Sequence, residues 1–155
     1  CSLEPHLPNR PALRLGLRQI DGFHRDWGDA MMDARRDRPF ASLEDLARRA
    51  CLPARALRLL ADADAFGSLA LSRRDALWEA RRTPAGELPL FAAARANELG
   101  DEPCAALPHM PMREEVATDY QSFRLSLKGH PMRFIRPVLA AEGTLSCTEA
   151  SGAKA

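Results

Sequence analysis

Apolar residues recur three and four positions apart through much of the first half of the chain, a spacing that predicts short amphipathic helices. The tight break Asp21-Gly22-Phe23-His24 separates the first two segments of this pattern. We therefore expect one helix from about Arg14 to Ile20 and a second from about Asp26 to Arg36. Because the connection is so short, the two helices must fold back on each other as a hairpin. The residues expected to line one face of each helix are Leu17 and Ile20 before the break, and Trp27, Met31 and Met32 after it.

Capping residues and a proline corner predict three further helices. Ser42 and Ser72 each stand three residues before an aspartate, which is the spacing of a capping box, so a helix should begin directly after each serine. Between them, Pro53 is favourable at the first position of a helix. Two consecutive helix-corner-helix units therefore occupy about residues 13–66, and the second of them turns at Cys51-Leu52-Pro53.

The helical pattern dissolves from Thr83 to about Ala117, where prolines interrupt the chain and acids outnumber bases, as in a linker or surface loop. After it, Thr118-Asp119-Tyr120-Gln121 predicts a capping box that opens a helix, with Gly129 as its end. Pro131 starts a further helix that Gly143 ends. The expected fold class is all-α, a tandem helix-hairpin-helix-like bundle followed by a proline-rich acidic linker and two C-terminal helices. Its expected parts are a segment leading into the helices (1–12), the helix-hairpin-helix region (13–82), the linker (83–117), a helical segment (118–143) and an approach to a following domain (144–155).

Composition is that of a globular protein, with 46% hydrophobic and 28% charged residues among 155. No apolar run is long enough to span a bilayer and nothing at the N-terminus reads as a signal peptide, so we expect a cytoplasmic protein with no membrane partner. The chain begins at Cys1 rather than methionine, so we expect a segment of a longer protein. Its four cysteines are widely spaced and predict no zinc site.

Charge is unevenly distributed along the chain. Residues 10–82 hold 15 arginines against 11 acidic residues, whereas residues 83–120 hold 2 arginines against 7 acids. From residue 121 to the end, 5 basic residues stand against 2 acids. The arginines of the first half suit bidentate contacts with phosphate, but charge alone makes nucleic-acid binding only one possibility.

The first hairpin corner carries the pattern of a phosphate site. Gly22 lets the backbone turn through positive φ, and the helix that follows presents amide N–H groups and the positive end of its dipole. This layout resembles the helix-hairpin-helix motif, which binds DNA backbone without reading sequence; His24 stands where that motif usually has a second glycine. The alternative is a plain α-helical hairpin with solvated charges. The predicted DNA contacts are Gly22, Phe23, His24 and Arg25, with Arg18 and Arg14 as further phosphate partners.

A short apolar cluster stands within the acidic linker: Glu87, Leu88, Pro89, Leu90 and Phe91. Exposed Leu and Phe side chains lose free energy in water unless they dock on a surface. The cluster resembles the pentapeptide with which bacterial polymerases and repair proteins bind the sliding clamp, although that peptide normally begins with glutamine. It could instead pack back onto this domain.

Catalytic patterns are missing from the sequence. It contains no phosphate-gripping glycine loop, no serine-hydrolase elbow and no zinc-protease motif. Asp62 and Asp64 have the look of a metal-binding pair but lack a third carboxylate. We therefore expect no catalytic residue and no metal or other cofactor in this segment.

Four sequence blocks together resemble the C-family bacterial DNA polymerases, most closely their error-prone branch. They are LGLRQIDGF, PFASLEDLARRACLPARALRLLADADAFGSL, ELPLF and DYQSFRLSLKGHPMRFI, and the resemblance covers nearly all of residues 13–147. It implies a DNA-directed DNA polymerase, a nucleotidyltransferase, whose palm binds Mg²⁺ through aspartates that are not in this segment. The segment would correspond to the duplex-gripping helix-hairpin-helix region, ahead of an oligonucleotide-binding barrel.

The resemblance also implies a role in damage-induced mutagenesis and translesion synthesis. The implied partners are duplex DNA and a catalytically inactive partner polymerase of the mutasome. A further possible partner is the sliding clamp, which residues 87–91 would contact. Two alternatives stay open at this point. One is a segment of the replicative polymerase III alpha subunit, and the other is a non-catalytic scaffold that recruits the clamp or mutasome partners.

Overall fold

The computed structural model describes residues 2–7, 10–83 and 107–152 of the chain. It divides into two compact units, one formed by residues 1–110 and the other by residues 111–155.

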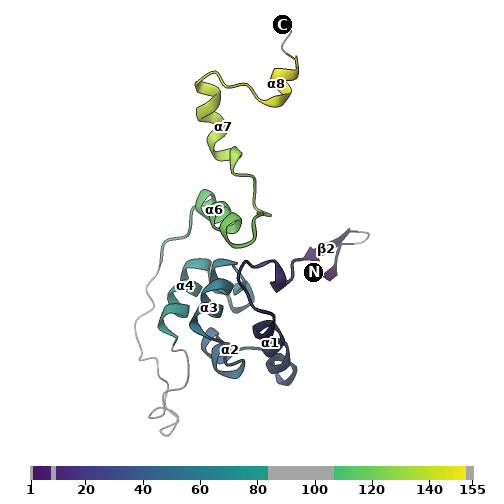
Figure 1. Cartoon of the computed structure of the whole chain (residues 1–155), viewed down its shortest axis with the longest axis vertical. Coiled ribbons are helices and arrows are strands. Elements are labelled where there is room, and N and C mark those ends of the chain that lie inside the picture. Colours follow the sequence, from purple (N-terminus) through teal and green to yellow (C-terminus); the bar gives the residue numbers. More distant parts are fainter. Residues whose placement is uncertain (1, 8–9, 84–106, 153–155) are drawn as a thin grey trace. The chain divides into compact units, whose positions relative to one another are not determined.

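The first unit opens with an antiparallel β-hairpin that the sequence did not predict. Strand β1 (Ser2–Leu7) pairs with strand β2 (Arg10–Arg14), with Ser2 opposite Arg14 (Figure 1). The predicted helix from Arg14 to Ile20 is wrong, since only the 3-10 turn η1 (Leu17–Gln19) forms there. The extended β2 strand and the extended backbone of Gly16 leave too few residues before the Gly22 corner to nucleate an α-helix.

Four α-helices follow in the described part of the first unit, and together with the helices of the second unit they confirm the predicted all-α class for the body of the protein. They are α1 (Arg25–Asp37), α2 (Leu43–Arg49), α3 (Ala54–Asp62) and α4 (Arg73–Arg82), with the 3-10 turn η2 (Gly67–Leu69) before α4. The predicted serine caps are present. The side-chain oxygen of Ser42 accepts the Asp45 amide at 3.0 Å, and that of Ser72 accepts the Asp75 amide at 3.3 Å.

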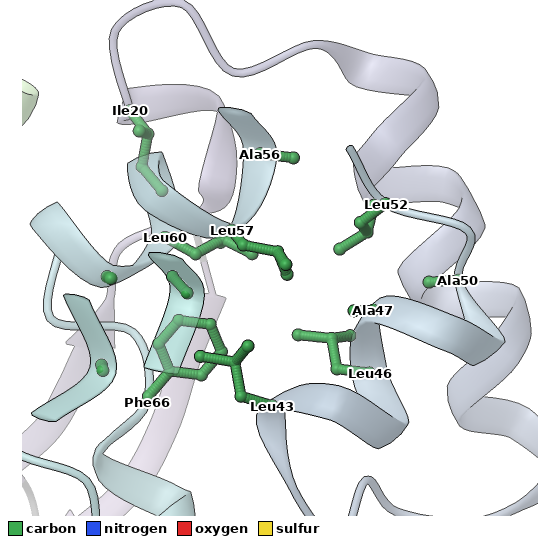
Figure 2. Packing of buried hydrophobic residues seen from close by; sticks show 13 residues of the cluster. Ile20, Leu43, Leu46, Ala47, Ala50, Leu52, Ala56, Leu57, Leu60 and Phe66 are labelled. Atoms are coloured by element: carbon green, nitrogen blue, oxygen red, sulfur yellow. The ribbon is translucent and has the colours of Figure 1, made fainter. Parts of the chain in front are cut away.

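A single cluster of leucines and alanines holds the helices of the first unit together. Figure 2 shows Leu43 and Leu46 of α2 facing Leu57 and Leu60 of α3, with Phe66 beside them. Leu43 and Leu57 are completely buried. Each fully buried leucine stabilises the fold by roughly 1.5–3 kcal/mol, so this cluster fixes how the α2–α3 hairpin packs.

The second unit contains α6 (Met112–Phe123), α7 (Met132–Ala141) and α8 (Cys147–Gly152). The predicted capping box at residues 118–121 is wrong, because these residues lie inside α6. The helix begins at Met112 with Pro111 as its N-cap, within the segment assigned to the linker, because two glutamates in its first turn favour an N-terminus there. It then continues through Thr118 since extending a helix costs less than nucleating a new one. Arg124, in the left-handed conformation at φ +61°, ends it before Gly129.

The turn between α6 and α7 is held by polar contacts to α6. Ser126 donates its hydroxyl to the buried Asp119 carboxylate at 2.6 Å, and the Lys128 ammonium reaches Glu115 at 2.7 Å. The ring of His130 lies edge-on to Tyr120, with their centroids 6.4 Å apart. These contacts give residues 124–130 a structural role.

The start and end of α7 agree with the sequence prediction. Pro131 is its N-cap, and Gly143 lies just beyond its end at φ +81°. The Nδ1 atom of His130 accepts the Met132 amide at 3.2 Å, which satisfies one donor at the helix N-terminus. The Gly-His-Pro sequence thus forms a helix-initiating corner.

Among the described residues, no helix combines the length and the apolar character that a membrane crossing requires.

Candidate nucleic-acid interface

Gly22 forms a sharp corner between η1 and α1. Its φ is +76°, a conformation that side chains other than glycine rarely adopt. The Phe23 amide donates to the carbonyl of Ile20 at 3.2 Å and closes the turn. Ile20 is buried and Phe23 packs against the same core, so the corner is anchored from both sides. The predicted tight break is therefore a fixed turn.

His24 is the N-cap of α1, but its side chain does not cap the helix. The imidazole lies against Trp27, with ring centroids 4.3 Å apart and a tilt of 52°. Phe23 contacts the same indole edge-on at 5.4 Å. The His24 ring packs beside Trp27 and makes no cap hydrogen bond, so this side chain does not occupy the first-turn amides of α1, and such amides suit a phosphate oxygen.

The predicted arginines occupy three different elements. Arg25 is the first residue of α1, and its exposed guanidinium lies 3.4 Å from the exposed Asp29 carboxylate. Arg18 is an exposed residue of η1, and Arg14 ends strand β2. The structure thus places Arg18 and Arg25 on the two elements that flank the Gly22 corner.

Sequence reasoning missed Arg55, which lies at the same corner. A Cβ atom added to Gly22 would be 3.5 Å from the Nη2 atom of Arg55, on the first turn of α3. The signal available in the sequence was weak. Arg55 closely follows the Cys51–Pro53 corner, but nothing in the sequence reports that this corner and the Gly22 corner are neighbours.

The second corner repeats the backbone of the first. Cys51 has φ +48°, the buried Leu52 points into the core, and Pro53 is the N-cap of α3 with φ −70° and ψ 155°. His24, which occupies the N-cap position of α1, has φ −78° and ψ 143°. Both corners therefore combine a left-handed residue, an inward apolar residue and an extended N-cap before a helix.

The outer surface of α3 continues from Arg55 into a shallow depression. Its lining residues are Arg55, Arg58, Leu59 and Asp62. Burial raises the pKa of Asp62, against the lowering effect of Arg58, Arg73 and Arg81. The charge of Arg58 therefore interacts in part with the Asp62 carboxylate of the same helix. In the part of the chain that the structure describes, no group of three or more His, Cys, Asp or Glu could hold a metal ion.

Arg49 of α2 fixes the end of α1. Its guanidinium donates to three carbonyls at the end of α1 and just beyond it, those of Ala34, Arg38 and Pro39, the last two at 2.9 and 3.3 Å. It also lies over the Phe40 ring, 4.8 Å from the centroid. These contacts cover carbonyls that the helix leaves unsatisfied and join the first helix-corner-helix unit to the second.

The predicted clamp-binding residues, Glu87, Leu88, Pro89, Leu90 and Phe91, lie outside the described residues.

Comparison with known proteins gives two results. The family model described as "Helix-hairpin-helix motif" matches residues 1–76. The chain is also similar to proteins named error-prone DNA polymerase. It is 50% identical to the one from Rhodopseudomonas palustris strain BisA53 over 97% of this chain and 15% of that protein. It is 59% identical to the one from Bradyrhizobium sp. strain ORS 278 over 80% of this chain and 11% of that protein.

A third relative, from Brucella abortus biovar 1, is 54% identical over 88% of this chain and 13% of its own length. The chain thus spans 15% or less of the length of these relatives. No solved structure matches it.

Proposed function

Because this chain belongs to the error-prone DNA polymerase family as a helix-hairpin-helix segment, we propose that it holds duplex DNA by its phosphate backbone. The observation that carries the proposal is the Gly22 corner, where a left-handed turn leads into a helix whose N-cap residue, His24, makes no side-chain cap hydrogen bond. Such an N-terminus is a binding site for phosphate oxygens, since its N–H groups and dipole both favour negative charge.

The mechanism of this binding is electrostatic and independent of base sequence. Amides and arginines that contact phosphates fix the position of the duplex but read no base edges. A helix terminus contributes about 0.3–1 kcal/mol to holding a charge at a solvent-exposed site, so the affinity of the corner alone is low. Binding should therefore be weak and depend steeply on salt.

The parent protein, in this proposal, is a cytoplasmic DNA-directed DNA polymerase that acts in damage-induced mutagenesis and translesion synthesis. Nucleotidyl transfer and its Mg²⁺ belong to a palm domain elsewhere in the polymerase, and the present segment contributes no catalytic residue. Its further partners would be the sliding clamp and a catalytically inactive partner polymerase. The support for this role is the identity of 50–59% to segments of error-prone DNA polymerases.

A direct test is the binding of this chain to a fluorescein-labelled DNA duplex, measured by anisotropy between about 25 and about 200 mM NaCl. The expected result is a Kd that rises steeply with salt and is the same for duplexes of unrelated sequence. An affinity that does not change over this range would contradict the phosphate mechanism.

A second candidate function is protein recruitment, which the apolar surface of α7 favours. Phe134, Ile135 and Val138 are 36%, 47% and 56% exposed, although they lie three and four positions apart as core residues usually do. Titration of the chain with purified sliding clamp separates the two recruitment routes. If the double variant Ile135→Glu plus Val138→Glu no longer binds the clamp, α7 is the clamp-binding surface. If Leu90→Ala plus Phe91→Ala no longer binds it, residues 87–91 are the clamp-binding segment.

A further inference from the structure

The segment that runs from the Gly22 corner into α1 carries little positive charge of its own, although a phosphate site needs such charge. Residues 21–29 contain three aspartates and one arginine. That arginine, Arg25, lies 3.4 Å from Asp29, and Asp26 is in the first turn of α1. A phosphate at the α1 amides would therefore meet a locally negative segment, which Arg18 of η1 and any cation brought from another element would have to offset.

Arg55 is a cation that the fold brings to this corner from the second helix-corner-helix unit. Its Nη2 atom lies 3.5 Å from the position of a Cβ on Gly22, which is van der Waals contact distance, so the guanidinium lies directly against the turn. Arg55 is exposed, and no carboxylate among the described residues lies within ion-pair distance of it. Its hydrogen-bond donors are thus available to a ligand.

We infer that Arg55, from the second helix-corner-helix unit, binds the DNA phosphate that the first unit holds at Gly22. The two units then form one composite phosphate site, with backbone amides from α1 and a guanidinium from α3. A guanidinium contacts phosphate through two parallel N–H donors, which adds orientation to charge attraction. This inference rests on the proposed function, since it assigns a residue to the same DNA contact.

Arg58 provides the control within the same helix. It is also exposed and lies one turn further along α3. Its charge acts on Asp62, whereas Arg55 lies against the Gly22 turn. Non-specific attraction of DNA to α3 would depend equally on both arginines, but a phosphate seated at Gly22 would depend on Arg55.

The experiment compares Arg55→Ala, Arg55→Lys and Arg58→Ala in the 155-residue chain, by the same anisotropy titration. We expect Arg55→Ala to weaken duplex binding about tenfold and to reduce the salt slope by about 0.9, the value for one phosphate contact. Arg55→Lys keeps the charge but loses the paired donors, so it should fall between the wild type and Arg55→Ala. Arg58→Ala should change Kd by less than about twofold. Thermal unfolding of the variants checks that the exposed substitutions leave the fold intact.

The fluorescence emission of Trp27, which lies at the corner beside His24, reports where the DNA makes contact. In a Trp78→Phe background Trp27 is the only tryptophan, and duplex DNA should change its emission. With Arg55→Ala added, this change should be much smaller even at DNA concentrations that saturate binding.

Three results would overturn these assignments. Equal losses of affinity in Arg55→Ala and Arg58→Ala would overturn the role of Arg55 while leaving DNA binding established. A full Trp27 response in saturated Arg55→Ala would place the Arg55 contact away from Gly22 and contradict the composite site. Absence of salt-dependent binding by the unaltered chain would overturn the proposed function and this inference together.

Discussion

Arg38 and Asp45 form a two-point ion pair, with guanidinium–carboxylate distances of 2.8 and 3.0 Å. The same carboxylate accepts the Ala41 amide at 3.1 Å and the Arg49 guanidinium at 3.2 Å. Burial by itself would raise the pKa of Asp45, but the hydrogen bonds from Arg38, Ala41 and Arg49 outweigh it and lower the pKa to about 2. One buried carboxylate thus ties the connection after α1 to the helix α2.

Replacing Asp45 by Asn should destabilise the protein by about 2–3 kcal/mol, because the amide cannot pair with two guanidinium groups. The cap of α2 would persist, since Ser42 accepts the backbone amide of residue 45. Chemical denaturation followed by circular dichroism measures the loss. Asp33→Asn is the control, because its pair with Arg36 is exposed and should be worth less than about 0.5 kcal/mol. Equal effects of the two substitutions would contradict this role for Asp45.

The same carboxylate predicts how stability depends on pH. The pKa of Asp45 is lower in the folded protein than in the unfolded chain, so its stabilisation is complete above the unfolded pKa of about 3.9. It is lost as the pH falls from about 4 to about 2, and the loss is about 1–2 kcal/mol after allowance for the half-exposed Arg38. Denaturation midpoints measured across this range should fall more steeply for the wild type than for Asp45→Asn. Parallel pH profiles of the wild type and Asp45→Asn would exclude Asp45 as the source of the loss of stability at low pH.

Replacing Gly22 by Ala should cost about 1 kcal/mol of stability, since alanine is strained at φ +76°. It should also weaken DNA binding, because relaxing the turn moves the α1 amides and places a Cβ near Arg55. Gly67→Ala is the control: an added Cβ there has no atom within 4 Å. A Gly22→Ala variant with unchanged Kd would show that the corner is not part of the interface.

His24 should be dispensable for both folding and binding. Its ring lies against Trp27 and makes no cap hydrogen bond to α1, so His24→Ala leaves the backbone amides in place. We expect an unfolding temperature within a few degrees of the wild type and a Kd within about twofold. A tenfold loss of DNA affinity at unchanged stability would instead make the imidazole a direct phosphate donor.

Ser126→Ala should loosen the turn between α6 and α7, because it removes a 2.6 Å hydrogen bond to the buried Asp119. The expected cost is about 1–3 kcal/mol. The near-ultraviolet circular dichroism of Tyr120, the only tyrosine, reports on this unit. Ser151→Ala, at an exposed serine, should leave the signal unchanged. If Ser126→Ala behaved in the same way, the turn would be held by other contacts.

Much of the helical architecture could be predicted because its signals are local. The caps at Ser42 and Ser72, the helix after Pro131 and the turn at Gly22 each depend on the conformational preferences of a few neighbouring residues. The errors also have a local explanation. Thr118–Gln121 matches a capping box, but a helix already propagating from Met112 passes through it. The sequence before η1 does hold the turn pair Pro8-Asn9, but Pro5 and Pro11 within the two strands argue against pairing, which depends on a partner strand.

The sequence by itself therefore determined the helical class, most helix starts and the existence of a glycine corner, since backbone propensity and capping act over a few residues. It also indicated a resemblance to error-prone DNA polymerases, and the chain is 50–59% identical to segments of proteins with that name. Only the tertiary structure decided that Arg55 lies at Gly22, that the His24 ring lies against Trp27 without capping α1, and that Arg38 and Arg49 share Asp45. Two of these contacts join a helix to a connecting segment outside it, and all three depend on side-chain placements that capping and periodicity do not specify. They arise only when the buried leucines of α2 and α3 fix how the helices pack.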